Sequence, residues 1–157
     1  MQLIIFIGLQ ASGKSTFFRT HFATTHEHIS KDLMRNNKNR ARRQMQLIEV
    51  AFQAGRSVVV DNTNPTTLDR AALIHQGQAH NAQIIGYYFA SRVSDCLERN
   101  QQRSGKARVP DVGIYATAKN LVRPSYGEGF HQLFCVQIAA DKTFNICVWT
   151  EPEVIHG

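Results

Sequence analysis

Blocks of apolar residues alternate with amphipathic segments along the chain, and each block predicts a strand or a helix. Residues 1–7, 57–60 and 84–89 are almost continuously apolar and rich in β-branched or aromatic residues, which is typical of strands buried on both faces. Weaker strand patterns lie at 28–30, 133–138 and 144–149. The pattern therefore predicts six strands, the last two joined by a short turn.

Between the strands, apolar residues recur at helical spacing. The predicted helices cover 14–22, roughly 32–54, 66–80, 94–103 and 111–122, with Gly55 ending the second and Thr66 or Thr67 capping the third. Strands that alternate with helices predict an α/β fold, here a single domain over 1–157 with a doubly wound, mostly parallel sheet and helices on both faces. In such a sheet, ligands bind at the carboxyl ends of the strands.

Composition narrows the class of protein. The N-terminal apolar run is too short to span a membrane and lacks the basic residues that open a signal peptide. The spacings of Cys96, Cys135 and Cys147 match neither a zinc site nor a disulfide framework. We expect buried, reduced thiols in a cytoplasmic protein that does not contact a membrane.

The net charge of +6 is concentrated in two segments. Residues 31–43 contain six basic residues and one acid, and residues 99–108 contain four basic residues and no acid. The rest of the chain is net negative. The two segments are either solvated helix faces or contacts for phosphate groups or a polyanion, and their positions beside the motifs below favour the second interpretation.

Residues 8–15 read GLQASGKS, the complete pattern of a phosphate-binding loop (P-loop), between a predicted strand and a predicted helix. Lys14 would supply a charge to the β- and γ-phosphates of a nucleotide, and the Ser15 hydroxyl would ligate Mg²⁺. Backbone N–H groups of such a loop face phosphate oxygens. The residues predicted to bind the nucleotide here are Gly8, Gln10, Ala11, Ser12, Gly13, Lys14, Ser15 and Thr16.

An acidic and a basic residue follow the second predicted strand, in the sequence SKDLMR. Asp32 and Arg35 are about one helical turn apart. In phosphoryl transfer to an alcohol, a carboxylate accepts the hydroxyl proton while a cation holds the acceptor's own phosphate. Asp32 could instead cap a helix.

Two further stretches carry candidate site residues. Asp61 ends the strand at 57–60, where P-loop proteins place the acid that supports Mg²⁺, although a plain turn would also begin there. Arg99 and Arg103 are four apart on a predicted helix, so we expect them to share a face. Within a lid at approximately 99–110, they would either neutralise a transferring phosphoryl group or face solvent.

Other candidates have simpler interpretations. We interpret His26 and His28 as surface histidines rather than a metal pair. Tyr87, Tyr88 and Phe89 are expected to pack in the core rather than stack on nucleic acid bases.

The motifs GLQASGKST, SKDLMR, VVVDNTNP and RNQQRSGKARVP, in this order from residue 1 to about 110, resemble the 5′-hydroxyl polynucleotide kinase family and its P-loop kinase relatives. The resemblance implies an ATP-dependent kinase in which Lys14 binds ATP, Asp32 is the general base, Arg35 clamps an acceptor phosphate and Arg103 is the lid arginine. It also implies a nucleic acid or nucleotide-like acceptor.

The same resemblance implies that Ser15 and Asp61 form the Mg²⁺ site and that Arg99 flanks the nucleotide. Three functions stay open on the sequence alone. The chain is a kinase for a polynucleotide 5′-hydroxyl, a P-loop kinase for a small metabolite, sugar or antibiotic, or a nucleotide-binding ATPase or switch that phosphorylates no acceptor. The oligomeric state is not indicated by the sequence.

Overall fold

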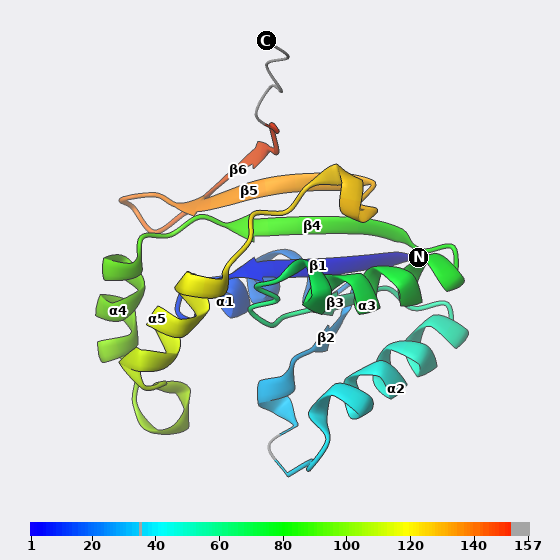
Figure 1. The fold of residues 1–157 in the computed structure, drawn as a ribbon, viewed down its shortest axis with the longest axis horizontal. Coiled ribbons are helices and arrows are strands. Elements are labelled where there is room, and N and C mark those ends of the chain that lie inside the picture. The colour runs from blue at the N-terminus through cyan, green and yellow to red at the C-terminus, as the bar shows by residue number, and fades with distance from the viewer. Residues whose placement is uncertain (35, 152–157) are drawn as a thin grey trace.

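The computed structural model describes residues 1–34 and 36–151, whose strands form one six-stranded sheet (Figure 1). The order across the sheet is β2-β3-β1-β4-β5-β6. Strands β1 to β5 are parallel, and β6 is antiparallel to β5. The strands are β1 (Gln2–Gly8), β2 (Glu27–Ile29), β3 (Val58–Val60), β4 (Gln83–Phe89), β5 (Gln132–Ile138) and β6 (Phe144–Val148).

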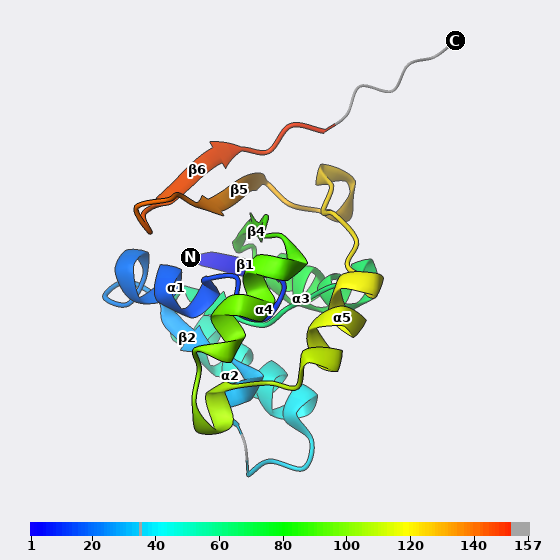
Figure 2. The same cartoon turned by 90° about the vertical axis from the view of Figure 1, so that its left-hand side faces the viewer.

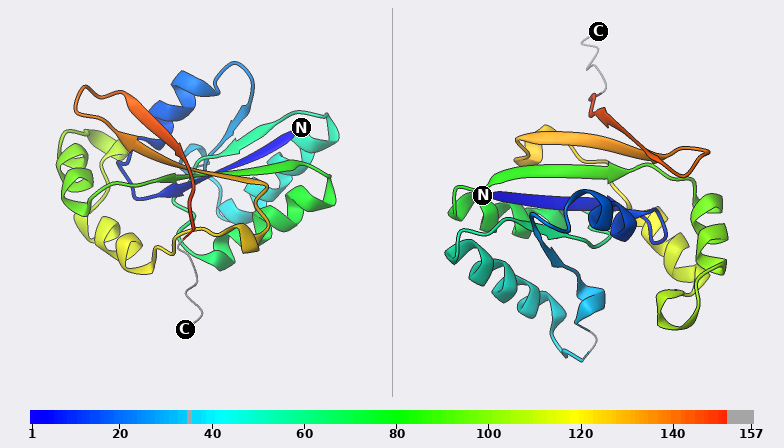
Figure 3. Two further views of the ribbon diagram at one scale, coloured as in Figure 1. Left: turned by 90° about the horizontal axis from the view of Figure 1, so that it is seen from above. Right: turned by 180° about the vertical axis from the view of Figure 1, so that it is seen from behind.

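Five helices connect the strands and lie on both faces of the sheet (Figures 2 and 3). They are α1 (Lys14–His21), α2 (Arg40–Gln53), α3 (Thr67–Ala79), α4 (Val93–Gln101) and α5 (Asp111–Asn120). Three 3₁₀ turns complete the described elements: η1 (Lys31–Leu33), η2 (Gly105–Ala107) and η3 (Tyr126–Glu128). The predicted α/β class and the doubly wound, mostly parallel sheet are confirmed.

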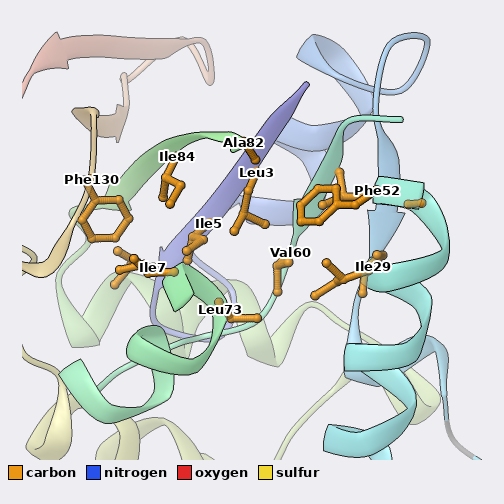
Figure 4. Close-up of a cluster of buried hydrophobic side chains, with 14 of the residues drawn as sticks. Leu3, Ile5, Ile7, Ile29, Phe52, Val60, Leu73, Ala82, Ile84 and Phe130 are labelled. Carbon is orange, nitrogen blue, oxygen red and sulfur yellow. The ribbon is translucent and has the colours of Figure 1, made fainter. Parts of the chain in front are cut away.

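Alternation along β1 explains why helices cover both faces. Leu3, Ile5 and Ile7 pack in one cluster with side chains of α2 and α3 (Figure 4). Ile4 and Phe6 point the opposite way and pack with aromatic residues of α1. Because successive side chains of a strand alternate between faces, the apolar run Leu3–Ile7 of β1 requires a helix layer on each side.

The basic helix predicted over roughly 32–54 is shorter in the structure. The chain makes the turn η1, and α2 begins only at Arg40, with the Asn39 side chain capping it by accepting a hydrogen bond from the Arg42 N–H at 3.1 Å. Asparagine side chains compete with the helical backbone for hydrogen bonds, so the run Asn36-Asn37-Lys38-Asn39 delays the helix. Lys31 therefore lies in η1 and Lys38 on the loop before α2, rather than on one long helix.

The loop that follows β3 is fixed by a buried ion pair. Arg70 of α3 is fully buried, and its Nε donates to Glu128 Oε1 at 2.8 Å. Its Nη1 donates to the carbonyl oxygen of Asn64 at 3.0 Å. Thr66 caps α3 in a capping box with Asp69, as one of the two predicted caps. These contacts hold the segment that follows Asp61.

The cysteines were predicted to be buried, and this prediction is wrong for two of the three. Cys96 is buried, Cys135 is half-buried and Cys147 is exposed, and all three are free thiols. Cys147 lies on β6, the edge strand, most of whose side chains face solvent. Tyr87 and Tyr88 pack against apolar clusters, as predicted. No helix in the described part of the chain combines the length and apolar character needed to cross a membrane.

Candidate functional site

The P-loop, Asp61 and Asp32 meet at the carboxyl ends of β1, β3 and β2. The P-loop follows β1, Asp61 follows β3, and Ser30 and η1 follow β2. β3 lies between β2 and β1 in the sheet, so residues distant in sequence converge on one edge. This is the edge at which parallel sheets bind ligands.

The P-loop backbone turns tightly because two of its residues are left-handed. Ala11 has a φ of 61° and Gly13 a φ of 96°. Gly13 also caps α1 and has no side chain that could occupy the first N–H groups of the helix. A Cβ on Gly13 would lie 3.0 Å from Ile138 Cδ1, so the β5–β6 hairpin packs directly on the loop. N–H groups at a helix start, together with the helix dipole, favour an anion there.

Lys14 is buried at the centre of the loop. Its Nζ donates to the carbonyl oxygens of Gly8 at 3.0 Å and of Leu9 at 2.5 Å. Burial lowers the pKa of Lys14 to about 8, against the opposing effect of the Asp61 carboxylate. An ammonium group taken out of water gains strongly from an anion placed beside it.

The side chains of Ser15 and Asp61 place two oxygen atoms that could ligate a metal ion close together. The Ser15 Oγ donates to Asp61 Oδ2 at 2.8 Å, and both residues line one cavity. Mg²⁺ prefers carboxylate and hydroxyl oxygens, so these two side chains fit the predicted ion.

His28 is not the simple surface histidine that the sequence suggested. Its Nε2 donates to Asp61 Oδ2 at 2.7 Å, and its ring stacks on Phe18 of α1 with centroids 4.0 Å apart. The sequence signal was its position two residues before Ser30, at the carboxyl end of a predicted strand. No group of three or more His, Cys, Asp or Glu side chains suited to a metal ion occurs in residues 1–34 and 36–151.

Asp32 lies in η1 at the rim of the cavity that Lys14, Ser15 and Asp61 also line. It does not cap a helix, because Ser30 caps η1 and Asn39 caps α2. Arg35, its predicted partner, lies outside the described residues.

Asn62 holds η1 in place, a role that the sequence did not reveal. Its Oδ1 accepts a hydrogen bond from the Lys31 N–H at 2.9 Å. Its Nδ2 donates to Gln44 Oε1 of α2 at 2.7 Å. Asn62 therefore connects the end of β3, the turn that carries Asp32 and the basic helix. Its only signal in the sequence was its place directly after Asp61.

Arg99 and Arg103 do not share a helix face, and this prediction is wrong. Helix α4 ends at Gln101, so Arg103 lies beyond it, with Nη1 donating to the Ala107 carbonyl oxygen at 3.4 Å. The Arg99 Nε donates to the Ala11 carbonyl oxygen at 2.6 Å. Arg99 thus supports the P-loop from α4, whereas Arg103 belongs to the following loop.

The side chains of the remaining loop residues have separate contacts. Gln10 Nε2 donates to Thr117 Oγ1 of α5 at 3.0 Å, and Ser12 is buried beneath the loop. Thr16 is exposed and faces two cavities.

Three adjoining cavities extend across the site. The first, of about 590 Å³, lies between α4 and the β5–β6 hairpin and includes Arg99 and Arg103. The second, of about 440 Å³, lies over the P-loop and is also lined by Arg103. The third, of about 470 Å³, is lined by Asp32 and the residues around Asn36. Arg103 is shared by the first two cavities and Asp32 by the last two.

Residues 3–121 match the model of the AAA_33 family, described as an AAA domain, and the chain belongs to this family. The chain is 26% identical over 149 residues to a protein of Acanthamoeba polyphaga mimivirus assigned to the bifunctional polynucleotide phosphatase/kinases, covering 90% of this chain and 34% of that protein. It is 23% identical over 133 residues to the bifunctional polynucleotide phosphatase/kinase of Schizosaccharomyces pombe, covering 82% of this chain and 32% of that protein. The chain thus spans about a third of the length of these relatives.

Solved structures share the fold. Chaetomium thermophilum Kti12 in complex with ADP-AlF₃ superimposes with a TM-score of 0.70 at 15% identity, covering 89% of this chain and 92% of that one. A gluconokinase from Sinorhizobium meliloti has a TM-score of 0.61 at 18% identity, covering 88% and 83%. The chain therefore has a P-loop kinase fold.

Proposed function

We propose that this protein is an ATP-dependent kinase that transfers the γ-phosphate to the 5′-hydroxyl of a polynucleotide or a nucleotide-like acceptor. The observation that carries the proposal is the row of three cavities, in which Arg103 and Asp32 occupy the two junctions. A donor nucleoside would occupy the first cavity, its triphosphate the second and the acceptor the third.

The donor half rests on the P-loop. N–H groups of the loop and of the α1 start would bind the phosphates, and Lys14 would exchange its carbonyl partners for phosphate oxygens. Ser15 and Asp61 would hold Mg²⁺, which neutralises phosphate charge when bound. Arg99 would flank the nucleoside from α4.

In the transfer step, the oxygen of the acceptor hydroxyl bonds to the γ-phosphorus, and Asp32 accepts the proton that this hydroxyl loses. The bond from the γ-phosphorus to the β,γ-bridging oxygen breaks, giving ADP and a phosphomonoester. Lys14 and Arg103, both lining the central cavity, stabilise the negative charge on the transferring group.

The acceptor half rests on charge. Arg40, Arg42 and Arg43 are exposed in the first turn of α2, which contains no acidic residue. The N-terminus of a helix is itself partly positive, so this cluster is a poor arrangement for the isolated helix and a favourable one for phosphate groups. The named activities of the two curated relatives support a polynucleotide acceptor, and in this proposal Arg35 binds a phosphate of that acceptor.

The test uses γ-labelled ATP with a 5′-hydroxyl oligonucleotide and with the same oligonucleotide already phosphorylated at its 5′ end. We expect label on the first substrate and none on the second. Label on neither, with transfer to a sugar or another small metabolite, would replace the acceptor in this proposal. ATP hydrolysis stimulated by nucleic acid, without a phosphorylated product, would replace the kinase itself.

A further inference from the structure

Asn100, at the end of α4, is fully buried and makes three hydrogen bonds with its side-chain amide. Its Nδ2 donates to the Val109 carbonyl oxygen at 2.7 Å and to Asp111 Oδ1 at 3.3 Å. Its Oδ1 accepts a hydrogen bond from the Val109 N–H at 3.0 Å. One amide therefore pairs with both backbone groups of a residue nine positions further along the chain.

These bonds close residues 101–109 into a loop, which we call the arginine loop. The loop contains three cations, Arg103, Lys106 and Arg108, and most of its residues are exposed. Like charges held close together repel one another, and an exposed loop has little packing to oppose that repulsion. The Asn100 amide provides a buried anchor for the closed shape.

The anchor requires an amide side chain of this length. In Asn100→Asp, an oxygen replaces the Nδ2 group that donates to the Val109 carbonyl and the Asp111 carboxylate. An ionised carboxylate cannot donate a hydrogen bond, so three acceptors would face one another. An alanine would leave the Val109 N–H and carbonyl groups without these side-chain partners, which destabilises the closed loop. Both changes would release the closed end of the arginine loop.

The anchored loop determines where Arg103 lies. The Arg103 N–H donates to the Asn100 carbonyl oxygen at 3.0 Å, and its side chain reaches Ala107 within the same loop. Arg103, Lys106, Ala107 and Val109 all line the cavity over the P-loop. Closing the loop at Val109 therefore keeps Arg103 and Lys106 at the cavity that Lys14 also lines.

We infer that Asn100 is a positioning residue for phosphoryl transfer, which holds Arg103 over the transferring phosphate. The inference rests on the proposed kinase function. Misplacing a charge by about 1 Å can cost on the order of 100-fold in rate. Lys14 and the N–H groups of the P-loop would bind the triphosphate directly, so we expect the loss to fall mainly on kcat and much less on ATP affinity.

The experiment compares Asn100→Ala, the isosteric Asn100→Asp and the matched control Gln101→Ala, an exposed residue in the same turn of α4. Each is also combined with Arg103→Ala. Transfer to the 5′-hydroxyl oligonucleotide gives kcat, ATP binding is measured separately, and trypsin cleavage after Arg103, Lys106 and Arg108 reports on loop closure without any activity.

We expect the Asn100 variants to lower kcat roughly 10- to 100-fold, with ATP affinity changed less than about threefold and Gln101→Ala unaffected. In the Arg103→Ala background, Asn100→Ala should lower kcat no further, because the arginine it positions is absent. Faster cleavage confined to the arginine loop is expected in both variants.

A loss of kcat that adds fully to that of Arg103→Ala would overturn the inference, as would cleavage unchanged in the folded Asn100→Asp variant. If wild-type protein transfers no phosphate to the oligonucleotide, the proposed function fails instead. The cleavage pattern then still decides whether Asn100 closes the loop.

Discussion

The P-loop and the two basic segments at 31–43 and 99–108 contribute residues to one cavity, the first basic segment only through Asp32, but they are built in different ways. The P-loop is largely buried, and its shape is set by its own backbone and by contacts from Arg99, Phe89 and the β5–β6 hairpin. The basic segments are mostly exposed, and their charges are carried by long side chains on loops and helix starts. In the proposed kinase, donor binding is therefore encoded in one short stretch, whereas acceptor binding depends on distant segments brought together.

The sharpest test of this difference is Lys14→Met. Removing the ammonium from the loop should lower transfer about 1,000-fold and weaken ATP binding, because no other side chain in the loop carries a full charge. The free energy of unfolding without nucleotide should stay equal or rise, since a buried charge is removed. Chemical denaturation and calorimetric ATP binding measure both quantities. A marked loss of stability would contradict the account of Lys14.

On the acceptor side, the largest single effect is expected for Asp32→Asn. The amide keeps the size of the side chain but accepts no proton, so kcat should fall about 100-fold or more. ATP affinity should change less than about threefold, because the donor half is intact. Steady-state kinetics with a titration of ATP separates the two. Normal transfer by this variant would remove Asp32 from its role as base.

The basic residues at the start of α2 should contribute to oligonucleotide binding through their charge alone. Replacing Arg40, Arg42 and Arg43 with glutamine should raise the oligonucleotide KM about tenfold and flatten its dependence on salt, with a log–log slope smaller by up to about 3. The ATP KM should not change. Arg56→Gln, at an exposed arginine paired with Glu27 near the amino ends of β2 and β3, serves as the control for each of the three changes made singly. If Arg56→Gln raised the oligonucleotide KM as much as the single changes in α2, the effect would come from the net charge of the protein and not from the position of these arginines.

The smallest effect is a pH dependence of ATP binding. The pKa of Lys14 is lowered to about 8, so the protonated form that attracts phosphate is lost as the pH rises through that value. Between pH 7 and 8.5 the Kd for ATP should rise about fourfold. In Lys14→Arg, which stays charged, the same interval should give a flat profile. A flat profile in the wild type would mean that the pKa of Lys14 lies above this pH interval.

The sequence predicted the fold, and it identified Lys14, Ser15 and Asp61, which line one cavity, because both predictions depend on local pattern. Apolar runs, the P-loop spacing and Asp61 at the end of a strand are each contained within a few residues. The helix start at Arg40 was missed because three asparagines override an otherwise helical pattern.

Contacts between segments could not be predicted in the same way. His28 against Asp61, Asn62 between Lys31 and Gln44, and Asn100 at Val109 all pair groups from separate elements. Polar side chains of this kind have no periodicity, so only the three-dimensional arrangement distinguishes them from solvated surface residues. Arg103 was placed on a helix for the same reason, because nothing local marks the helix end at Gln101.

We propose that the protein binds ATP and a polynucleotide end in the row of cavities and transfers the γ-phosphate between them. It is tested most directly by competition, with γ-labelled ATP offered to an equimolar mixture of a 5′-hydroxyl oligonucleotide, a nucleoside and a sugar acid. We expect label on the 5′ end of the oligonucleotide, removed by Asp32→Asn and reduced by rising salt. Label only on a small molecule, or only in inorganic phosphate, would contradict it.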